Sequence, residues 1–254
     1  MGGTEHLKVS VSGAVRTVTL DRPAKRNALT PAMLEALSEA FTAEPGPEER
    51  VAVVRATPPA FCAGIDLSGG RETVESVVGI EQALHAVEHY PLPVIAVVDG
   101  DAIAGGAELA IHCDLVVASE SARFGMSLAQ IGLVAPWPLA VKLLDVAGHA
   151  LARELLLLGD PVPAGRLAEL GVIARAVPAA AVESTAQAMI GRLTANAPLS
   201  LRAMKAALVR AASVRGQLPH DDVDALGDAA RRSDDAREGM RARLEKRTAE
   251  FRGH

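Results

Sequence analysis

The sequence predicts an α/β fold in which short parallel strands alternate with helices. Residues 94–98 and 115–118 are apolar runs, and a Pro and a Gly bound the first of them. Strands that are buried on both faces of a parallel sheet have this composition. Segments with a helical pattern separate these strands, and such alternation is typical of α/β proteins. Beyond Pro136 we expect an almost entirely helical chain.

The first ninety residues are predicted to form a hairpin, two helices and a strand. Residues 7–20 alternate around Ser12-Gly13, which indicates an opening hairpin. A helix is expected to begin at Thr30-Pro31, with Thr as the N-cap and Pro at the first helical position, and to end near residue 43. A short strand at 51–55 and a second helix at 73–89 follow.

Glycines, prolines and the charge pattern predict the remaining elements. Gly105-Gly106 is expected to begin a helix after the strand at 94–98. One more short strand is predicted at 172–177, within the helical part. The last helix is expected at 235–251, where both signs of charge are mixed, as on a solvated or subunit-facing surface.

Composition limits the class of protein and its partners. The chain has 254 residues, of which 49% are hydrophobic and 22% charged, so one large domain, or a domain with a helical extension, can bury a sizeable core. Aromatic residues make up only 2%, so Ala, Val and Leu must fill that core. A net charge of −5 argues against nucleic acid as a partner.

The cellular setting is also predicted from composition. The two cysteines, Cys62 and Cys113, have neither metal-site nor redox spacing, which indicates buried thiols in a reducing compartment. We find no signal peptide and no run of about 18 apolar residues, the length that spans a membrane. A cytoplasmic protein without membrane association is therefore expected.

Two segments carry most of the functional information. Residues 61–67 (Phe-Cys-Ala-Gly-Ile-Asp-Leu) and 102–109 (Ala-Ile-Ala-Gly-Gly-Ala-Glu-Leu) each place a small residue where a backbone N–H can remain free. Two such amides that converge on one carbonyl oxygen make an oxyanion hole, which stabilises an enolate or a tetrahedral anion. The second segment also carries a carboxylate, Glu108, three residues after Gly105.

Four stretches of the chain resemble the enoyl-CoA hydratase/isomerase (crotonase) superfamily. They occur in the family's order and together extend over nearly the whole length: 20–29, 61–67, 93–114, and 235–240 with 245–247. The resemblance implies a crotonase-like spiral of repeated ββα units in residues 1–197. It also implies a helical C-terminal region, residues 198–254, that takes part in a homotrimer or homohexamer.

The resemblance also implies the residues of the site. The N–H groups of Ala63 and Gly105 would hold the thioester oxygen of an acyl-CoA, and Glu108 would be the catalytic acid or base. A helix start at Gly105 agrees with this role, because the free amide and the helix dipole both favour negative charge. The alternatives are that the glycines merely turn a strand into a helix and that Glu108 complements the dipole.

Further positions follow from the same resemblance. CoA is expected to contact the segments around the following residues, mostly through backbone atoms: Lys25, Arg26, Ala28, Ala63, Asp66 and Leu67. The side chain of Asp66 is expected to bond nearby backbone amides. Residues expected to line the acyl pocket are Ile65, Leu67, Leu128 and Trp137. CoA enters as part of the substrate, so we expect no separate cofactor and no metal.

The chain departs from the family at one position that matters for the chemistry. Leu128 stands where the hydratases of the family usually carry a second glutamate and where its isomerases generally carry a carboxylate, and Leu cannot exchange a proton. Hydration or isomerisation of an enoyl-CoA remains the leading hypothesis, since proton transfer between two carbons needs only one base. The alternatives are an acyl-CoA-binding paralogue with weak or lost activity, and a crotonase-type decarboxylase or thioester hydrolase, the last with Ser127 as nucleophile.

One further motif matches a metal-binding pattern, but its position does not favour a metal site. His85, Glu88 and His89 match the H-x-x-E-H pattern of inverted zinc proteases. The run lies at the end of a predicted helix, where His is favoured by the dipole, and no third ligand is evident.

Overall fold

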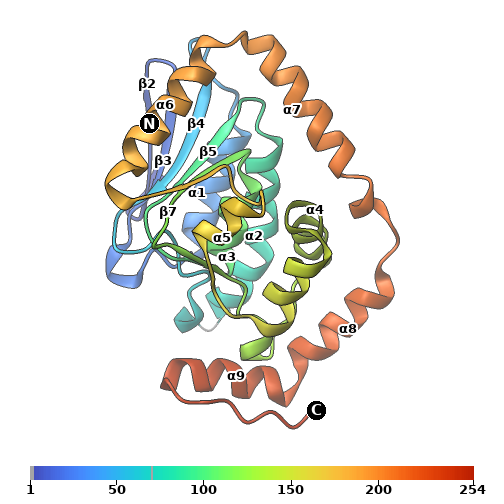
Figure 1. Ribbon diagram of the computed structural model, residues 1–254. Helices are drawn as coiled ribbons and strands as arrows, with labels where there is room; N and C mark the ends of the chain where they lie inside the picture. Colours follow the sequence, from blue (N-terminus) through green and yellow to red (C-terminus); the bar gives the residue numbers. More distant parts are fainter. Residues whose placement is uncertain (1–2, 70) are drawn as a thin grey trace.

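The computed structural model describes residues 3–69 and 71–254, and its centre is a seven-stranded sheet (Figure 1). Along the sheet the strands are β1 (Gly3–Thr4), β2 (Leu7–Ser12), β3 (Val15–Leu20), β4 (Val51–Ala56), β5 (Val94–Val98), β7 (Leu115–Ser119) and β10 (Arg175–Val177). The first two pairings are antiparallel and the other four are parallel. The predicted opening hairpin and the strand at 94–98 are confirmed.

Helices cover both faces of this sheet. The helices of the first half are α1 (Pro31–Thr42), α2 (Arg71–His89) and α3 (Gly105–His112). Alternate residues of each strand, such as Val94 and Ala96, pack into a large core with these helices. The intervening residues, such as Ile95 and Val97, pack against α6 (Val182–Ala195) on the opposite face. This double burial explains why the strand sequences are apolar throughout rather than alternating.

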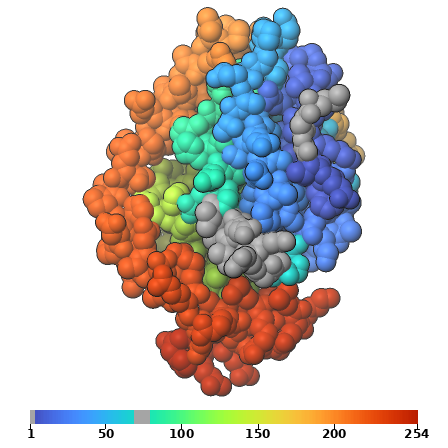
Figure 2. All heavy atoms as spheres, turned by 180° about the vertical axis from the view of Figure 1, so that it is seen from behind, coloured from blue at the N-terminus to red at the C-terminus, as the bar shows by residue number. Residues whose placement is uncertain are grey.

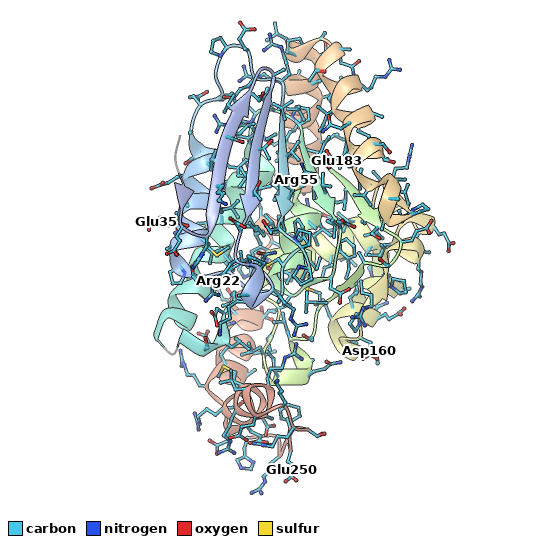
Figure 3. The ribbon with its side chains drawn as sticks, turned by 90° about the vertical axis from the view of Figure 1, so that its left-hand side faces the viewer. Arg22, Glu35, Arg55, Asp160, Glu183 and Glu250 are labelled. Atoms are coloured by element: carbon cyan, nitrogen blue, oxygen red, sulfur yellow. The ribbon has the colours of Figure 1, made fainter. Side chains whose placement is uncertain are left out.

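Local sequence determines several of the element boundaries. The side chain of Thr30 accepts a hydrogen bond from the N–H of Met33 (3.3 Å), which caps α1 as predicted. Gly13, with φ of 55°, forms the hairpin turn. On the far face, an ion pair between Arg55 of β4 and Glu183 of α6 joins that helix to the sheet (Figure 3).

A second, smaller sheet was not predicted. It contains β6 (Ala102–Ile103), β8 (Arg123–Gly125) and β9 (Val162–Pro163), in the order β6-β8-β9. Its strands have only two or three residues, which is too short for a periodic pattern to show in the sequence. Because β6 leads directly into α3, this sheet positions the start of that helix.

The C-terminal part is helical, as expected, and its last helices lie on the outside of the molecule (Figures 1 and 2). Its helices are α4 (Trp137–Arg153), α5 (Ala164–Glu169), α6, α7 (Pro198–Ala212), α8 (Asp221–Arg232) and α9 (Asp234–Glu245). Helix α7 begins at the predicted domain boundary, although the division into 1–197 and 198–254 itself stays a prediction. None of the helices in the described ranges is long and apolar enough to cross a lipid bilayer.

The end of the last helix is a correction to the sequence prediction. Helix α9 ends at Glu245 rather than near residue 251, because Lys246 adopts a left-handed conformation with φ of 57°. The tail then runs back along the helix, where the N–H groups of Arg252 and Gly253 donate to the carboxylate of Asp235 (both 2.7 Å). Tertiary hydrogen bonds therefore end a helix that charge pattern alone would extend.

Candidate functional site

The two segments singled out in the sequence meet backbone to backbone. Cys62 forms a bridge with Ala102, and its carbonyl accepts the N–H of Ile103 (2.9 Å). A Cβ placed on Gly64 would lie 3.4 Å from the nitrogen of Gly105 and 3.1 Å from the carbonyl oxygen of Ile103. Gly64 also has φ of 91°, so only glycine suits this position. The 61–67 loop and the start of α3 thus form one surface.

The backbone hydrogen bonds decide which amides of the loop are available. The N–H of Ala63 donates to the carbonyl of Arg26 (3.0 Å), so the prediction that Ala63 supplies a free donor is wrong. Leu29 pairs with Ile65 as a parallel bridge, through the Gly64 carbonyl and the Asp66 N–H. A parallel bridge leaves the central residue's own N–H unused. Within the described chain, the N–H of Ile65 has no hydrogen-bond acceptor.

The second donor lies at the start of α3. Gly105 is the first residue of the helix, so its N–H has no acceptor within the helix. Ala104 precedes it with φ of 47°, an unusual value for a residue with a side chain, and its N–H donates to Gly125 (2.7 Å). Backbone strain of this kind is concentrated at functional sites. The small sheet, through Gly125, holds the strained turn from which α3 begins at Gly105.

Glu108 lies in the first turn of α3 with only 6% of its surface exposed. Burial, assisted by the charge of Glu81, raises the pKa of its carboxyl to about 7. A carboxyl with this pKa is present in both protonation states near neutral pH, so it can accept or donate a proton. The site therefore combines two backbone N–H groups, those of Ile65 and Gly105, that have no backbone acceptor among the described residues with one carboxyl of matched pKa.

A neutral histidine supports the same helix one turn later. The ring Nδ1 of His112 lies 2.7 Å from the backbone carbonyl of Glu108. Burial, with the nearby charge of Lys142, lowers the pKa of His112 to about 4, so the ring is neutral at physiological pH. The neutral Nδ1–H donates to that carbonyl and fixes the ring. Sequence reasoning named His112 only as a possible substitute for the missing carboxylate.

Cys62 contributes to the geometry and not as a nucleophile. Its side chain is fully buried, and burial raises the pKa of the thiol to about 12. The Sγ atom accepts the N–H of Gly64 (3.4 Å), and the thiol donates to the Gly64 carbonyl (3.9 Å), which belongs to the peptide that carries the Ile65 N–H. The expectation of a buried thiol is confirmed for both cysteines.

The opening segment of the chain is joined to the donor loop by a network that the sequence did not reveal. Arg22 pairs with Asp66 (2.7 Å) and donates to the carbonyl of Ala28 (3.2 Å). Asn27 is fully buried and donates to the carbonyls of Thr57 (2.8 Å) and Ala60 (2.7 Å). A lone Asn among charged residues gives no periodic signal, so only the tertiary contacts identify its role.

The expected local role of Asp66 is confirmed. Its carboxylate accepts the backbone N–H and the hydroxyl of Ser68. Although burial opposes the effect, these bonds and Arg22 lower the pKa of Asp66 to about 2. Contacts with CoA stay predictions for all six residues named for them: Lys25, Arg26, Ala28, Ala63, Asp66 and Leu67.

The position of the missing second carboxylate is apolar in three dimensions as well. Leu128 precedes a short 3₁₀ helix, η3 (Ala129–Ile131), and its side chain packs against the main core. Trp137 follows as the first residue of α4. That Ile65, Leu67, Leu128 and Trp137 line an acyl pocket stays a prediction.

The zinc-protease motif has another explanation in the structure. Glu88 forms an ion pair with Lys142 of α4 (2.6 Å), and the rings of His85 and His89 stack with 3.8 Å between centroids. No group of three potential ligands is found among the described residues. The three side chains of the motif therefore have structural contacts that account for them.

The chain is similar to known proteins over nearly its whole length. The family model described as enoyl-CoA hydratase/isomerase matches residues 10–254. A putative enoyl-CoA hydratase of Thermus thermophilus is 36% identical over 94% of this chain and 98% of that protein. The 2,3-dehydroadipyl-CoA hydratase of Escherichia coli is 31% identical over 97% of this chain and 98% of its own length.

Solved structures show the same fold. An enoyl-CoA hydratase from Mycobacterium avium subsp. paratuberculosis superposes with a TM-score of 0.87 at 27% identity, over 97% of this chain and 98% of that one. A methylmalonyl-CoA decarboxylase in complex with 2-nitronate-propionyl-CoA superposes with a TM-score of 0.89 at 26% identity, over 98% and 99%. The expected crotonase-like α/β fold is confirmed.

Proposed function

The chain belongs to the enoyl-CoA hydratase/isomerase family, and from this premise we propose that it moves a proton on an enolised acyl-CoA thioester. The N–H groups of Ile65 and Gly105 hold the thioester oxygen. Glu108 exchanges the proton. The observation that carries the proposal is the buried Glu108, whose pKa of about 7 suits it to both directions of transfer.

The chemistry follows from these groups. The ionised Glu108 removes a proton from the carbon chain of the enoyl thioester, and the electron pair moves onto the thioester oxygen. Two preorganised N–H donors stabilise that oxygen more strongly as its negative charge develops. The protonated Glu108 then returns the proton to a different carbon, which shifts the double bond.

One carboxyl suits isomerisation better than hydration. Water addition needs a base to activate the water and an acid to protonate the α-carbon. Leu128 removes one of the two groups that the family uses for these tasks. We therefore propose isomerisation of an enoyl-CoA as the faster reaction, with hydration by Glu108 and water as the slower one.

The assembly and setting are part of the same proposal. Large apolar side chains on α7 and α8 are exposed in the single chain, for example Leu208 with 72% of its surface. These exposed apolar side chains support a homotrimer or homohexamer in which subunits bury them, and light scattering of the purified protein would measure its mass. The two buried thiols support a cytoplasmic location, and no cofactor is needed besides the CoA of the substrate.

The test is an NMR time course with crotonyl-CoA and 3-butenoyl-CoA in D₂O. Interconversion of the two, with deuterium entering the α- or γ-carbon, is the expected result, and 3-hydroxybutyryl-CoA should form more slowly. In the Glu108→Gln variant we expect both rates to fall about 10²- to 10⁴-fold, the usual contribution of a positioned acid or base. Unchanged rates in that variant would contradict the proposal.

A second candidate function has one observation in its favour. Decarboxylation breaks a carbon–carbon bond, releases CO₂ and leaves the electron pair as the same enolate, so it needs the two N–H donors but no second carboxylate. Leu128 is compatible with that reaction, and the superposition on a methylmalonyl-CoA decarboxylase extends over 98% of the chain. Release of CO₂ from methylmalonyl-CoA, without turnover of either enoyl-CoA, would favour this function.

A further inference from the structure

Helix α2 carries a row of ionisable side chains along one of its faces. Glu81, His85 and Glu88 follow one another at spacings of four and three residues, so they share one side of the helix. Ala83 and Val87, on another side, are buried in the main core. The row is therefore distinct from the face with which α2 packs on the sheet, and it is free to meet other elements.

The row faces the helix that carries Glu108. Helices α2 and α3 pack against each other (Figure 1), and His85 and Glu88 are close enough for their charges to act on His112. His112 lies one turn after Glu108 on α3. In the same way, His85 lies one turn after Glu81 on α2. This register places Glu81 opposite Glu108.

The residue before Glu81 packs directly against a donor of the site. A Cβ added at Gly105 would lie only 2.6 Å from the Cδ1 atom of Ile80, so the Ile80 side chain fills the space over Gly105. Ile80 itself is buried. Helix α2 is thus fixed against the start of α3 one residue away from Glu81, and the charge of Glu81 acts on Glu108. Glu81 therefore lies at the edge of the site.

The two carboxyl groups have opposite surroundings. Glu108 is buried, whereas Glu81 is exposed to solvent. Among the residues that the structure describes, neither side chain has a hydrogen-bond or ion-pair partner, so both remain available to a substrate and to water. Burial favours the protonated form of Glu108, and the charge of Glu81 adds to this effect. Two carboxyls whose surroundings separate them in this way suit the roles of acid and base.

We propose that Glu81 is the second acid–base group of the site and activates the water molecule that adds to an enoyl-CoA. It supplies from α2 the carboxylate that Leu128 does not supply. The inference rests on the proposed function and names the base for the slower of its two reactions. It makes Glu81 a catalytic residue for hydration and not for isomerisation.

Hydration then divides between the two carboxyls. The Glu81 carboxylate takes one proton from a water molecule, whose oxygen forms a bond to the β-carbon. The electron pair of the double bond moves onto the thioester oxygen, which the N–H groups of Ile65 and Gly105 stabilise. As the carbonyl re-forms, the protonated Glu108 gives its proton to the α-carbon. Glu81 releases its proton to solvent and Glu108 takes one up, which restores both groups.

The first experiment separates the two reactions in one variant. Glu81→Gln keeps the size of the side chain but cannot take a proton from water. By NMR at pH 7, with crotonyl-CoA and 3-butenoyl-CoA, we expect hydration to fall about 10²- to 10⁴-fold and isomerisation to change by less than about threefold. Glu35→Gln, which removes an exposed carboxylate from α1, is the matched control and should change neither rate. Equal losses of both reactions in Glu81→Gln, or no loss of hydration, would overturn the inference.

The second experiment compares the pH dependence of the two reactions in the unmodified protein. Hydration needs the protonated form of Glu108, so its rate should fall as pH rises through the pKa of about 7. Isomerisation begins with the ionised form, so its rate should rise over the same range. If ionised Glu108 activated the water itself, hydration would also rise with pH. That result would overturn the role of Glu81 as the base.

The outcomes distinguish this inference from the proposed function. Isomerisation without any hydration by the unmodified protein would overturn the role of Glu81 and leave the proposed function standing. Turnover of neither enoyl-CoA would overturn both. Loss of hydration alone in Glu81→Gln, with opposite pH dependences of the two reactions in the unmodified protein, is the result that supports both.

Discussion

The region around Glu108 and the outer helices α7–α9 are held together in different ways. In the first region glycines let backbone meet backbone: a Cβ on Gly106 would lie 2.7 Å from the Cβ of Cys62 and closer still to its carbonyl oxygen. In the second region polar side chains supply many of the contacts, and residues such as Leu208 remain exposed. Close backbone packing fixes the donors, whereas the outer helices leave surface for other contacts.

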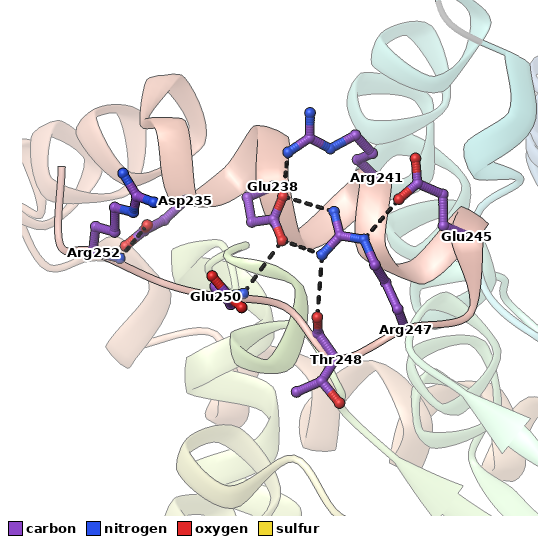
Figure 4. A network of polar contacts seen from close by, with 8 residues as sticks. All are labelled: Asp235, Glu238, Arg241, Glu245, Arg247, Thr248, Glu250 and Arg252. Carbon is purple, nitrogen blue, oxygen red and sulfur yellow. Dashed lines mark hydrogen bonds and ion pairs between the residues drawn. The ribbon is translucent and has the colours of Figure 1, made fainter.

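The polar network on α9 illustrates the second type of contact (Figure 4). Glu238 pairs with Arg241 and Arg247, and it also accepts the N–H of Glu250 from the returning tail. Beneath the network, a Cβ on Gly239 would lie 2.7 Å from the Cα of Ile131. One glycine contact therefore seats α9 on η3, and exposed ion pairs hold the tail over it.

The largest stability effect is expected for Gly106→Ala. Its new methyl group would overlap the backbone of Cys62. Cys62 is itself bridged to Ala102 and cannot move away. We therefore expect a loss of more than about 3 kcal/mol in unfolding free energy. Urea denaturation measures it. Gly191→Ala is the control, because Gly191 lies on an exposed face of α6 and an added Cβ would have no atom within 4 Å. This variant should gain up to about 1 kcal/mol in unfolding free energy.

Gly239→Ala makes a similar overlap in the outer region, between α9 and the backbone of Ile131. Helix α9 lies near the end of the chain and can shift away from η3. We therefore expect a clearly smaller loss of global stability than for Gly106→Ala, together with faster proteolysis of the tail. Equal losses in the two variants would show that α9 belongs to the same cooperative unit as the core.

Glu108→Gln tests how much unfolding free energy is lost because the carboxyl of Glu108 is buried. The folded carboxyl stays protonated up to a pKa of about 7, whereas the unfolded one ionises above about 4.5. Stability of the parent protein is therefore lost as pH rises between these values, by about 3 kcal/mol in all, at 1.36 kcal/mol per pKa unit. The variant should match the parent at pH 4 and exceed it by up to that amount at pH 8.

The difference between the two proteins is the quantity to measure, by urea denaturation at pH 4, 6 and 8. His112, with its lowered pKa, makes stability rise with pH over part of the same range, but both proteins share that contribution. A difference that does not change with pH would contradict the buried, protonatable state of Glu108.

Lys205→Met tests how α7 is attached to the core. Lys205 is 7% exposed, and its ammonium contacts Asp114 (2.7 Å) and the carbonyl of Leu92 (3.1 Å). The variant leaves Asp114 without its charged partner, and because that carboxylate is partly solvated we expect a loss of about 2 kcal/mol. The double variant Lys205→Met/Asp114→Asn should recover part of the loss, and no recovery would show that packing alone is responsible.

The smallest effect is expected for Arg247→Ala in the outer network. Its guanidinium is exposed and bonds Glu238 and Glu245, and exposed ion pairs contribute little to global stability. We expect an unchanged melting temperature but faster trypsin cleavage within residues 248–254. A clear drop in melting temperature would contradict the division between the two regions.

Elements with local signals were predicted well from the sequence. Thr30 and Pro31 began α1 as expected, and the apolar run 94–98 matched β5 residue for residue. The Gly105 helix start and the position of Glu108 in its first turn were also correct. Caps, prolines and buried strands depend on a few neighbouring residues, so the sequence alone contains their signal.

The donor in the 61–67 loop was predicted incorrectly for a physical reason. The small side chain of Ala63 suggested an open amide, but a backbone N–H is made available by its hydrogen-bond partners and not by its side chain. The carbonyl of Arg26 accepts the Ala63 N–H, and Leu29 forms a parallel bridge with Ile65 that leaves the Ile65 N–H unused. Both partners are more than thirty residues away in sequence.

By itself the sequence determined the α/β class, the family, the helix start at Gly105 and the presence of one carboxyl at Glu108 where Leu128 replaces the other. These depend on residue type and on short-range pattern. Three other features could be seen only in the folded chain: Ile65 rather than Ala63 leaves its N–H free, the pKa of Glu108 lies near 7, and the indole N–H of Trp137 is unpaired among the described residues. Each of these depends on burial and on hydrogen-bond partners that folding brings from distant parts of the chain.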